Sequence, residues 1–319
     1  MQTMRPEVLE WLRQGEPWLQ QAVLEAQGQE DPASRRKAAA DPLVTALVSE
    51  VEQWPWMPLN SHKAVGHPLH QLSFLADLGL GAEVLGLDPL LDDILAAQAV
   101  PGPLRLPMSI PPRYGGSGAT EMSWVLCDAP LLTRSLTLLG RRADPRVQGS
   151  ARALNAMVRS NGWPCLSCPE LKGFRGPGRK NDPCPFANLI MLQLNAELPD
   201  EVGSVATRAG IEAALHLWDR SRELHPYMFF MGTDFRKTKA PLAWYDILHV
   251  ADVLSRFPEA RRDPRLRSMV DLIRGSADAD GRYTAGAVWL RWNKWEFGQK
   301  KTPSRYITLK ASIIEDRMS

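Results

Sequence analysis

Cysteine is scarce in this sequence, with four residues in a chain of 319. Secreted domains held by disulfides use cysteine far more densely, which argues against a disulfide framework. Residues 1–10 also lack the apolar core of a secretory signal. We therefore expect a cytoplasmic protein whose cysteines are free thiols, metal ligands or catalytic groups.

Long hydrophobic runs are missing as well. Asp, Gly or Pro interrupts each apolar stretch well before the roughly 20 residues that a membrane-spanning helix needs, so no membrane span is predicted. The formal net charge of +2 is too small to indicate a nucleic-acid partner by itself. Apolar residues make up 44% of the chain, enough for a large core. The 11 tryptophans indicate large buried contacts or a ligand surface.

What the sequence does contain is a segment that recurs about every 60 residues. Each copy begins with a polar loop, continues as an apolar helix and stops at Leu-Gly or before proline. The equivalent helix starts are His67, Cys127, Cys184, Tyr245 and Ser304. Such a period is typical of a helical repeat architecture, in which the loops at equivalent positions meet at one end of the molecule.

Hydrophobic periodicity predicts five buried inner helices. They cover residues 68–80, 129–139, 186–198, 244–257 and 306–314. Capping signals, mostly Asp-Pro pairs, begin four outer helices near residues 88, 144, 199 and 263. Three further helical stretches cover residues 6–13, 17–26 and 42–51.

These twelve predicted helices form six inner/outer pairs and define an all-α fold. We expect residues 1–319 to form one domain whose first 60 residues are less regular. The apolar inner helices and the long loops favour closure of the pairs into an α/α toroid. The alternative is an open α-solenoid of the HEAT kind.

Glycine-aromatic turns and loop motifs add a family resemblance. The stretches that carry it are 124–130, 161–163, 174–185, 232–237, 244–246, 280–283 and 297–301. They resemble the α/α-toroid superfamily of terpenoid cyclases and protein prenyltransferases, and more closely uncharacterised bacterial proteins with prenyltransferase or squalene-oxidase repeats. The resemblance covers about residues 60–319 and implies the toroid fold. It implies no activity, because the Asp-x-Asp-Asp acid of cyclases and the spacing of the prenyltransferase zinc ligands are both absent.

The cysteine spacing predicts a metal site. Two residues separate Cys165 from Cys168, and fifteen separate Cys168 from Cys184, as in three quarters of a common zinc pattern. Cys127, one repeat earlier, would supply the fourth thiolate. The predicted ligands are Cys127, Cys165, Cys168 and Cys184, holding zinc in preference to an iron–sulfur cluster. His67, His70, Asp128 or Asp182 is an alternative to one cysteine, and simple burial of the thiols is the other interpretation.

Cations concentrate in three loops that precede successive inner helices, with aromatic residues between them. Because helix N-termini favour anions, these loops predict a basic, aromatic-lined cleft for an anionic, isoprenoid-like or diphosphate-like ligand. The expected ligand-binding residues are Arg175, Arg179, Lys180, Arg236, Lys237, Trp244, Tyr245, Lys300 and Lys301. The alternative is that these cations are ordinary solvated loop residues.

Acid–base candidates flank the fourth inner helix. Asp246 and His249 lie three residues apart on one helix face, and a histidine held by a carboxylate can act as a general base. Asp234 precedes them, and the candidate catalytic residues are therefore Asp234, Asp246 and His249. A buried histidine that merely satisfies its ring nitrogens is the competing interpretation.

Two functional classes stay open from the sequence. One is an enzyme acting on an anionic small molecule. The other is a non-catalytic protein with a structural metal that binds an acidic partner, either nucleic acid or an acidic peptide.

Overall fold

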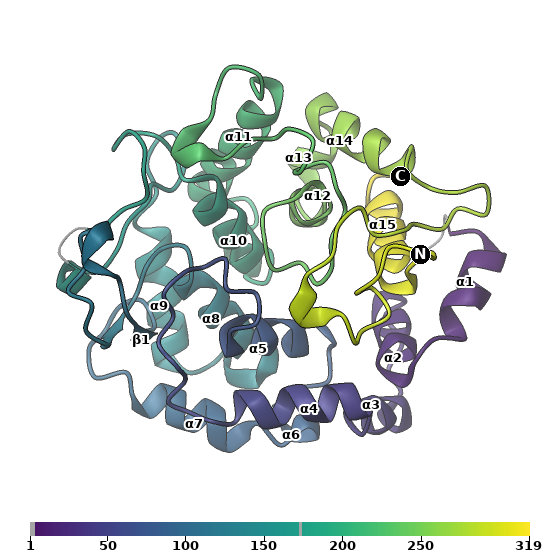
Figure 1. The fold of residues 1–319 in the computed structure, drawn as a ribbon, viewed down its shortest axis with the longest axis horizontal. Helices are drawn as coiled ribbons and strands as arrows, with labels where there is room; N and C mark the ends of the chain where they lie inside the picture. The colour runs from purple at the N-terminus through teal and green to yellow at the C-terminus, as the bar shows by residue number, and fades with distance from the viewer. Residues whose placement is uncertain (1–3, 172–173) are drawn as a thin grey trace. The chain divides into compact units, whose positions relative to one another are not determined.

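The computed structural model describes residues 4–171 and 174–319, and the protein is all-α (Figure 1). The chain divides into two compact units that are each assembled from separate segments. Unit 1 comprises Met1–Leu47, Asp77–Leu80 and Met231–Ser319. Unit 2 comprises Val48–Ala76 and Gly81–Phe230.

Unit 1 is built from short helices that mostly begin at proline. They are α1 (Pro6–Arg13), α2 (Pro17–Ala26), α3 (Pro32–Ala39), the first part of α4 (Pro42–Val51), α12 (Ile247–Leu254), α13 (Pro258–Arg261), α14 (Pro264–Arg274) and α15 (Arg305–Arg317). Helix α12 packs against α14 and α15. The core includes an aromatic cluster in which the Trp18 ring lies 5.0 Å from Trp295 and 5.7 Å from Tyr306, centroid to centroid.

Unit 2 is centred on α10, whose eleven residues are all buried. Its helices are α5 (Pro68–Asp77, less its last residue), α6 (Ala82–Leu85), α7 (Asp88–Ala96), α8 (Ala129–Leu136), α9 (Pro145–Asn155), α10 (Pro185–Asn195) and α11 (Val205–Asp219). Helix α10 packs against α8 and α11 (Figure 1). A π-helical turn, η2 (Thr137–Arg141), continues α8 and ends where Gly140 takes a positive φ of 97°.

The remaining regular structure is short. Strands β1 (Leu106–Met108) and β2 (Glu121–Ser123) form an antiparallel ribbon in which Leu106 pairs with Ser123. The 3₁₀ turns are η1 (Pro112–Tyr114), η3 (Pro169–Leu171), η4 (Pro199–Glu201), η5 (Pro226–Met228) and η6 (Leu290–Trp292). In the described part of the chain no helix is both long and apolar enough to cross a membrane.

The helices lie where hydrophobic periodicity and capping signals predict them. Helices α1, α2 and α4 have the predicted bounds, and the five inner helices are α5, α8, α10, α12 and α15. Side chains of Asp144, Asp263 and Ser304 cap α9, α14 and α15 by accepting backbone N–H groups. Helices α3, α6 and α13 and the β1–β2 ribbon were not predicted from the sequence. The toroid and the single domain stay predictions.

Candidate functional site

Three of the four cysteines converge in unit 2, at the ends of two packed helices. Cys127 lies just before α8 and Cys184 is the N-cap of α10, and their sulfur atoms are 3.9 Å apart. The sulfur of Cys165, from the long loop before α10, hydrogen-bonds both of these thiols. The proximity predicted from the repeat is therefore present, because α8 packs directly on α10. We call Cys127, Cys165 and Cys184 the thiol cluster.

Cys168 lies apart from the thiol cluster. It is fully buried, and its thiol hydrogen-bonds the carboxylate of Glu170. Across residues 4–171 and 174–319, no group of three or more His, Cys, Asp or Glu side chains is arranged to hold a metal ion. The predicted four-cysteine zinc site thus stays a prediction, with only three of its ligands brought together.

The three thiols of the cluster differ in charge. Hydrogen bonds from Cys127 and Cys184, and one of 3.1 Å from the amide of Gly176, lower the pKa of Cys165 to about 3. Hydrogen bonds with Cys165 and Cys184, followed by burial, raise the pKa of Cys127 well above its usual value. The hydrogen bond with Cys127 lowers the pKa of Cys184, but its hydrogen bond to Cys165 and burial outweigh this and raise it to about 12.

His62 lies beside the thiol cluster and is neutral. Its ring stacks on Phe186 of α10 with the centroids 5.5 Å apart. Burial, followed by the charge of Lys63, lowers the pKa of His62 to about 4, although the charge of Cys165 raises it. His62 was not predicted to lie near the cysteines, because it is not one of the equivalent helix starts of the repeat.

Tyr227 lies against the loop that carries Cys165 and has a strained backbone. Tyr227 and Met228 have positive φ angles of 51° and 62°, which cost about 1–3 kcal/mol each in a non-glycine residue. The Tyr227 hydroxyl donates to the carbonyl of Arg179 at 3.0 Å and accepts from the amide of Cys165. A Cβ atom at Gly178 would come within 2.9 Å of the Tyr227 ring, so the loop needs glycine there. No sequence signal revealed this arrangement.

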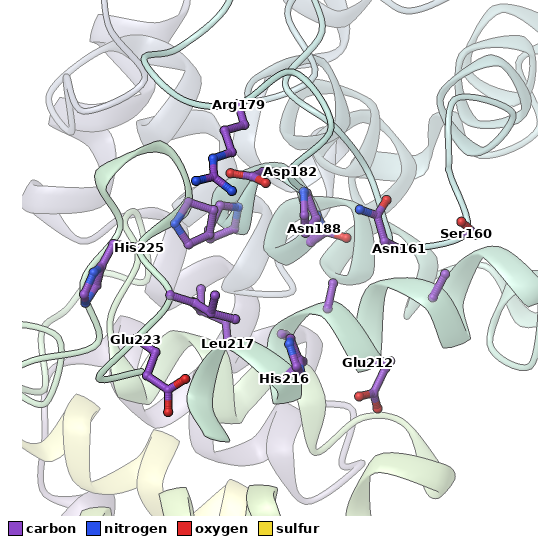
Figure 2. A pocket seen from close by; sticks show the side chains of 17 residues that line it. Ser160, Asn161, Arg179, Asp182, Asn188, Glu212, His216, Leu217, Glu223 and His225 are labelled. Carbon is purple, nitrogen blue, oxygen red and sulfur yellow. The ribbon is translucent and has the colours of Figure 1, made fainter. Parts of the chain in front are cut away.

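A cavity of about 540 Å³ lies beside these elements, also within unit 2 (Figure 2). One wall is the start of α10 and the loop before it, and the other is α11 with the turn after it. Its polar lining comprises Ser160, Asn161, Arg179, Asp182, Asn188, Glu212, His216, Glu223 and His225. Prolines 183 and 185, on either side of Cys184, line the same cavity, so the thiol cluster and the cavity share one loop.

At least three of the polar lining residues already have partners within the protein, and one of them is Asn161, whose side chain donates to the carbonyl of Asn181 at 2.9 Å. The Asn188 side chain accepts from the amide of Trp163 at 2.9 Å and donates to its carbonyl at 2.8 Å. Gly162 approaches it so closely that a Cβ atom would lie 2.5 Å from the Asn188 oxygen, which explains the glycine of this turn. Glu223 is paired with Arg220.

The side chain of Arg179 differs from these residues. Within the described residues its guanidinium forms no ion pair or hydrogen bond, and Figure 2 shows it on the same wall as Asp182. Its backbone, by contrast, is fixed by the Tyr227 hydroxyl. The result is an available cation at the edge of the cavity.

The structure divides the other predicted ligand-binding residues between the two units. Arg175 and Lys180 flank Arg179 in unit 2 and are exposed, the Arg175 guanidinium donating to the carbonyl of Gly178. The exposed cations of unit 1 lie in the loops before α12 and α15. They are Arg236, Lys237, Lys300 and Lys301. In the same unit Trp244 is half-buried, and Tyr245 is buried with its ring 5.3 Å from that of Phe235.

The acid–base candidates also lie in unit 1. Asp246 is the N-cap of α12, and one carboxylate oxygen accepts the amides of Leu248 and His249 at 3.0 and 3.1 Å. The contact expected between Asp246 and His249 is therefore made by the His249 backbone, while its ring Nδ1 lies 2.8 Å from the Trp244 carbonyl. Asp234 is 77% exposed and pairs with Lys237 and with the buried Lys239.

No protein-family model matches the chain, and no curated protein is significantly similar to it.

Proposed function

We propose that unit 2 binds a small anionic molecule in its cavity, with Arg179 as the anion-binding residue. The observation that supports this most is the available guanidinium on a cavity wall whose backbone is held by Tyr227. A volume of about 540 Å³ lies within the range of roughly 300–1,000 Å³ usual for small-ligand sites. The planar fork of arginine matches carboxylate and phosphate oxygens in a bidentate geometry.

The lining narrows the chemistry of the ligand. Carboxylates of Asp182 and Glu212 accompany Arg179, while Leu217 and the prolines give an apolar floor. A ligand that fits carries one anionic group for Arg179, a hydrogen-bond donor for Asp182 and an apolar portion. A diphosphate attached to an isoprenoid-like chain, bound by an α/α toroid, is the finer form of this proposal and draws on the family resemblance.

Titration calorimetry with pyrophosphate tests the anion site. In Arg179→Gln we expect affinity to fall about 10- to 100-fold, because one charge-assisted hydrogen-bonding group contributes roughly 1.5–3 kcal/mol. Lys180→Gln is the matched control. It removes one positive charge at the next residue, whose side chain does not line the cavity. Its affinity should stay within about twofold of the unaltered protein.

Equal binding by the unaltered protein and Arg179→Gln would refute the role of Arg179. Equal losses in both variants would instead show that the loop acts only through its total charge. Circular dichroism of both variants checks that the fold is unchanged.

A further inference from the structure

Two loops of unit 1 lie against each other and are rich in exposed cations. Residues 232–239 belong to the loop before α12, and residues 286–302 to the loop before α15. The amide of Gly286 donates to the carbonyl of Thr238 at 2.9 Å, and a Cβ atom at Gly286 would lie 3.0 Å from the Cα of Lys237. We call the two segments the basic loop pair. Its exposed cations are Arg236, Lys237, Arg291, Lys294, Lys300 and Lys301.

Both acids of the basic loop pair already have partners. Asp234 pairs with Lys237 at 3.4 Å and with Lys239 at 3.1 Å. The carboxylate of Glu296 accepts three hydrogen bonds of 2.8–3.0 Å at the start of α15. Within residues 4–171 and 174–319, by contrast, three ammonium groups of the pair form no ion pair or hydrogen bond. They belong to Lys294, Lys300 and Lys301.

An apolar tip lies within the same loop pair. Residues 287–290 read Ala-Val-Trp-Leu, and none of these side chains is fully buried. Leu290 begins the turn η6 and is 82% exposed. Trp289 is half-buried, with the Lys239 ammonium 5.3 Å from the centroid of its ring. Apolar side chains bordered by cations are typical of protein surfaces that bind the interface of an anionic membrane.

We propose that the basic loop pair binds the surface of an anionic membrane. The cations contact the lipid headgroups, and Leu290 enters the boundary between headgroups and acyl chains. Each Lys or Arg close to an anionic membrane raises the partition coefficient about fivefold, so several cations together give measurable binding. This inference goes beyond anion binding by unit 2, because no residue of the cavity takes part in it.

The aromatic rings of the loop pair favour lipid over nucleic acid as the partner. Proteins that bind single-stranded nucleic acid stack bases on accessible aromatic rings. Here Trp292, Trp295 and Phe297 are buried and pack on one another, with centroids 5.7–6.2 Å apart. The most exposed apolar side chain of the pair is the aliphatic Leu290, which can insert among acyl chains but offers no ring for stacking.

The first experiment measures sedimentation of the unaltered protein with lipid vesicles. At about 0.15 M salt, vesicles of phosphatidylcholine with about 30% phosphatidylserine should bind it at least about tenfold more strongly than vesicles of phosphatidylcholine alone. Raising the salt to about 0.5 M should release most of the bound protein, because the attraction of exposed charges is screened.

A charge variant tests the cations. Lys300→Gln/Lys301→Gln should lower the partition coefficient about 10- to 30-fold. Arg36→Gln/Lys37→Gln is the matched control, because it removes two adjacent exposed cations from α3, in the same unit but outside the loop pair. Its partition coefficient should stay within about twofold of the unaltered protein.

A second variant tests the apolar contact. Leu290→Ser should lower the partition coefficient about 5- to 10-fold, because the side chain no longer leaves water on binding. Val205→Ser is its control, since Val205 is 74% exposed at the start of α11 in unit 2, and its binding should be unchanged. Circular dichroism should show an unaltered fold in both variants, because both side chains are exposed.

Three results would overturn the proposal. One is failure of the unaltered protein to bind phosphatidylserine vesicles, and salt-sensitive binding of a single-stranded oligonucleotide would then identify nucleic acid as the partner. Another is an equal loss in the two charge variants, which would show that only the total charge of the protein matters. The third is full vesicle binding by Leu290→Ser. Loss of vesicle binding in Lys300→Gln/Lys301→Gln with unchanged pyrophosphate affinity would separate this surface from the cavity of unit 2.

Discussion

At the residue scale, Asp246 and Asp263 can be compared directly, because each is the N-cap of a helix in unit 1. Their surroundings differ. Burial raises the pKa of Asp246 to about 7, although its backbone hydrogen bonds and the charge of Lys239 lower it and that of Asp234 raises it. The hydrogen bond from the side chain of Arg265 lowers the pKa of Asp263. Of these two caps, therefore, only Asp246 has a negative charge that destabilises the folded state.

The raised pKa of Asp246 predicts how stability changes with pH. Between pH 4 and 7 the native state binds a proton at Asp246 that the unfolded chain has released, so stability falls as pH rises through this window. Asn keeps the capping oxygen without the charge. We expect Asp246→Asn to be more stable than the unaltered protein at pH 8, by up to about 3 kcal/mol, and to differ little at pH 4. Urea unfolding at both pH values measures this.

Asp263→Asn is the matched control, because it makes the same substitution at the cap of α14. Because the pKa of Asp263 is lowered, its effect on stability changes with pH in the opposite direction. The charge of Asp263 stabilises the folded protein above pH 4, and this stabilisation is lost as pH falls. The control should be equally or less stable than the unaltered protein at pH 8. A pH 8 stability of Asp246→Asn no higher than that of the unaltered protein would contradict the burial argument.

Individual residues were also where prediction from sequence had its limits. The convergence of Cys127 and Cys184 followed from the repeat, because both precede inner helices. Tyr227 could not be assigned to the site, since its position depends on a positive φ that no propensity indicates. Cys168 was grouped with Cys165 by spacing alone, and spacing does not reveal on which side of the loop each side chain lies.

At the scale of elements, sequence patterns predicted much more. Helix starts follow from Asp-Pro pairs and apolar periodicity, which act locally, and the structure has α7, α9 and α14 at such starts. Helix α3 was missed although Asp31-Pro32 begins it, because its residues are mostly polar and charged and give little apolar periodicity. The ribbon of β1 and β2 has only three residues per strand, too few for an alternating pattern.

A buried ion pair joins two inner helices of unit 1. The side chain of Asp252 on α12 is 1% exposed and lies 3.1 Å from Arg317 of α15 and 3.3 Å from Arg256. Burial raises the pKa of Asp252, but attraction from Arg256 and Arg317 outweighs it and holds the pKa far below its usual value. The carboxylate is therefore charged in the core, where it compensates two cations.

Removal of this carboxylate should be costly. We expect Asp252→Ala to lower the free energy of unfolding by about 3–5 kcal/mol, because it leaves uncompensated charge at a buried position. Asp271→Ala on α14 removes an exposed partner of Arg274 and should cost less than about 1 kcal/mol. Denaturant unfolding followed by circular dichroism gives both values. Similar values for the two variants would show that the Asp252 pair contributes no more than a surface pair.

At the scale of the whole molecule, the two units differ in what they offer a ligand. The thiol cluster and the cavity belong to unit 2, which consists of Val48–Ala76 and Gly81–Phe230. Unit 1 contributes exposed cations in the loops before α12 and α15. The sequence predicted one cleft from all these residues, because the repeat treats equivalent loops alike. Cation spacing cannot tell which loops border a cavity.

A double variant tests whether one unit suffices for anion binding. Lys300→Gln/Lys301→Gln removes two exposed charges from the loop before α15 in unit 1. If the cavity of unit 2 is the whole site, pyrophosphate affinity should stay within about twofold of the unaltered protein, since exposed charges that do not contact the ligand are screened at 0.15 M salt. Calorimetry at 0.15 M salt makes the comparison with Arg179→Gln direct. A loss as large as that of Arg179→Gln would mean that cations of both units bind one ligand, as the sequence predicted, and that the proposal for unit 2 alone is wrong.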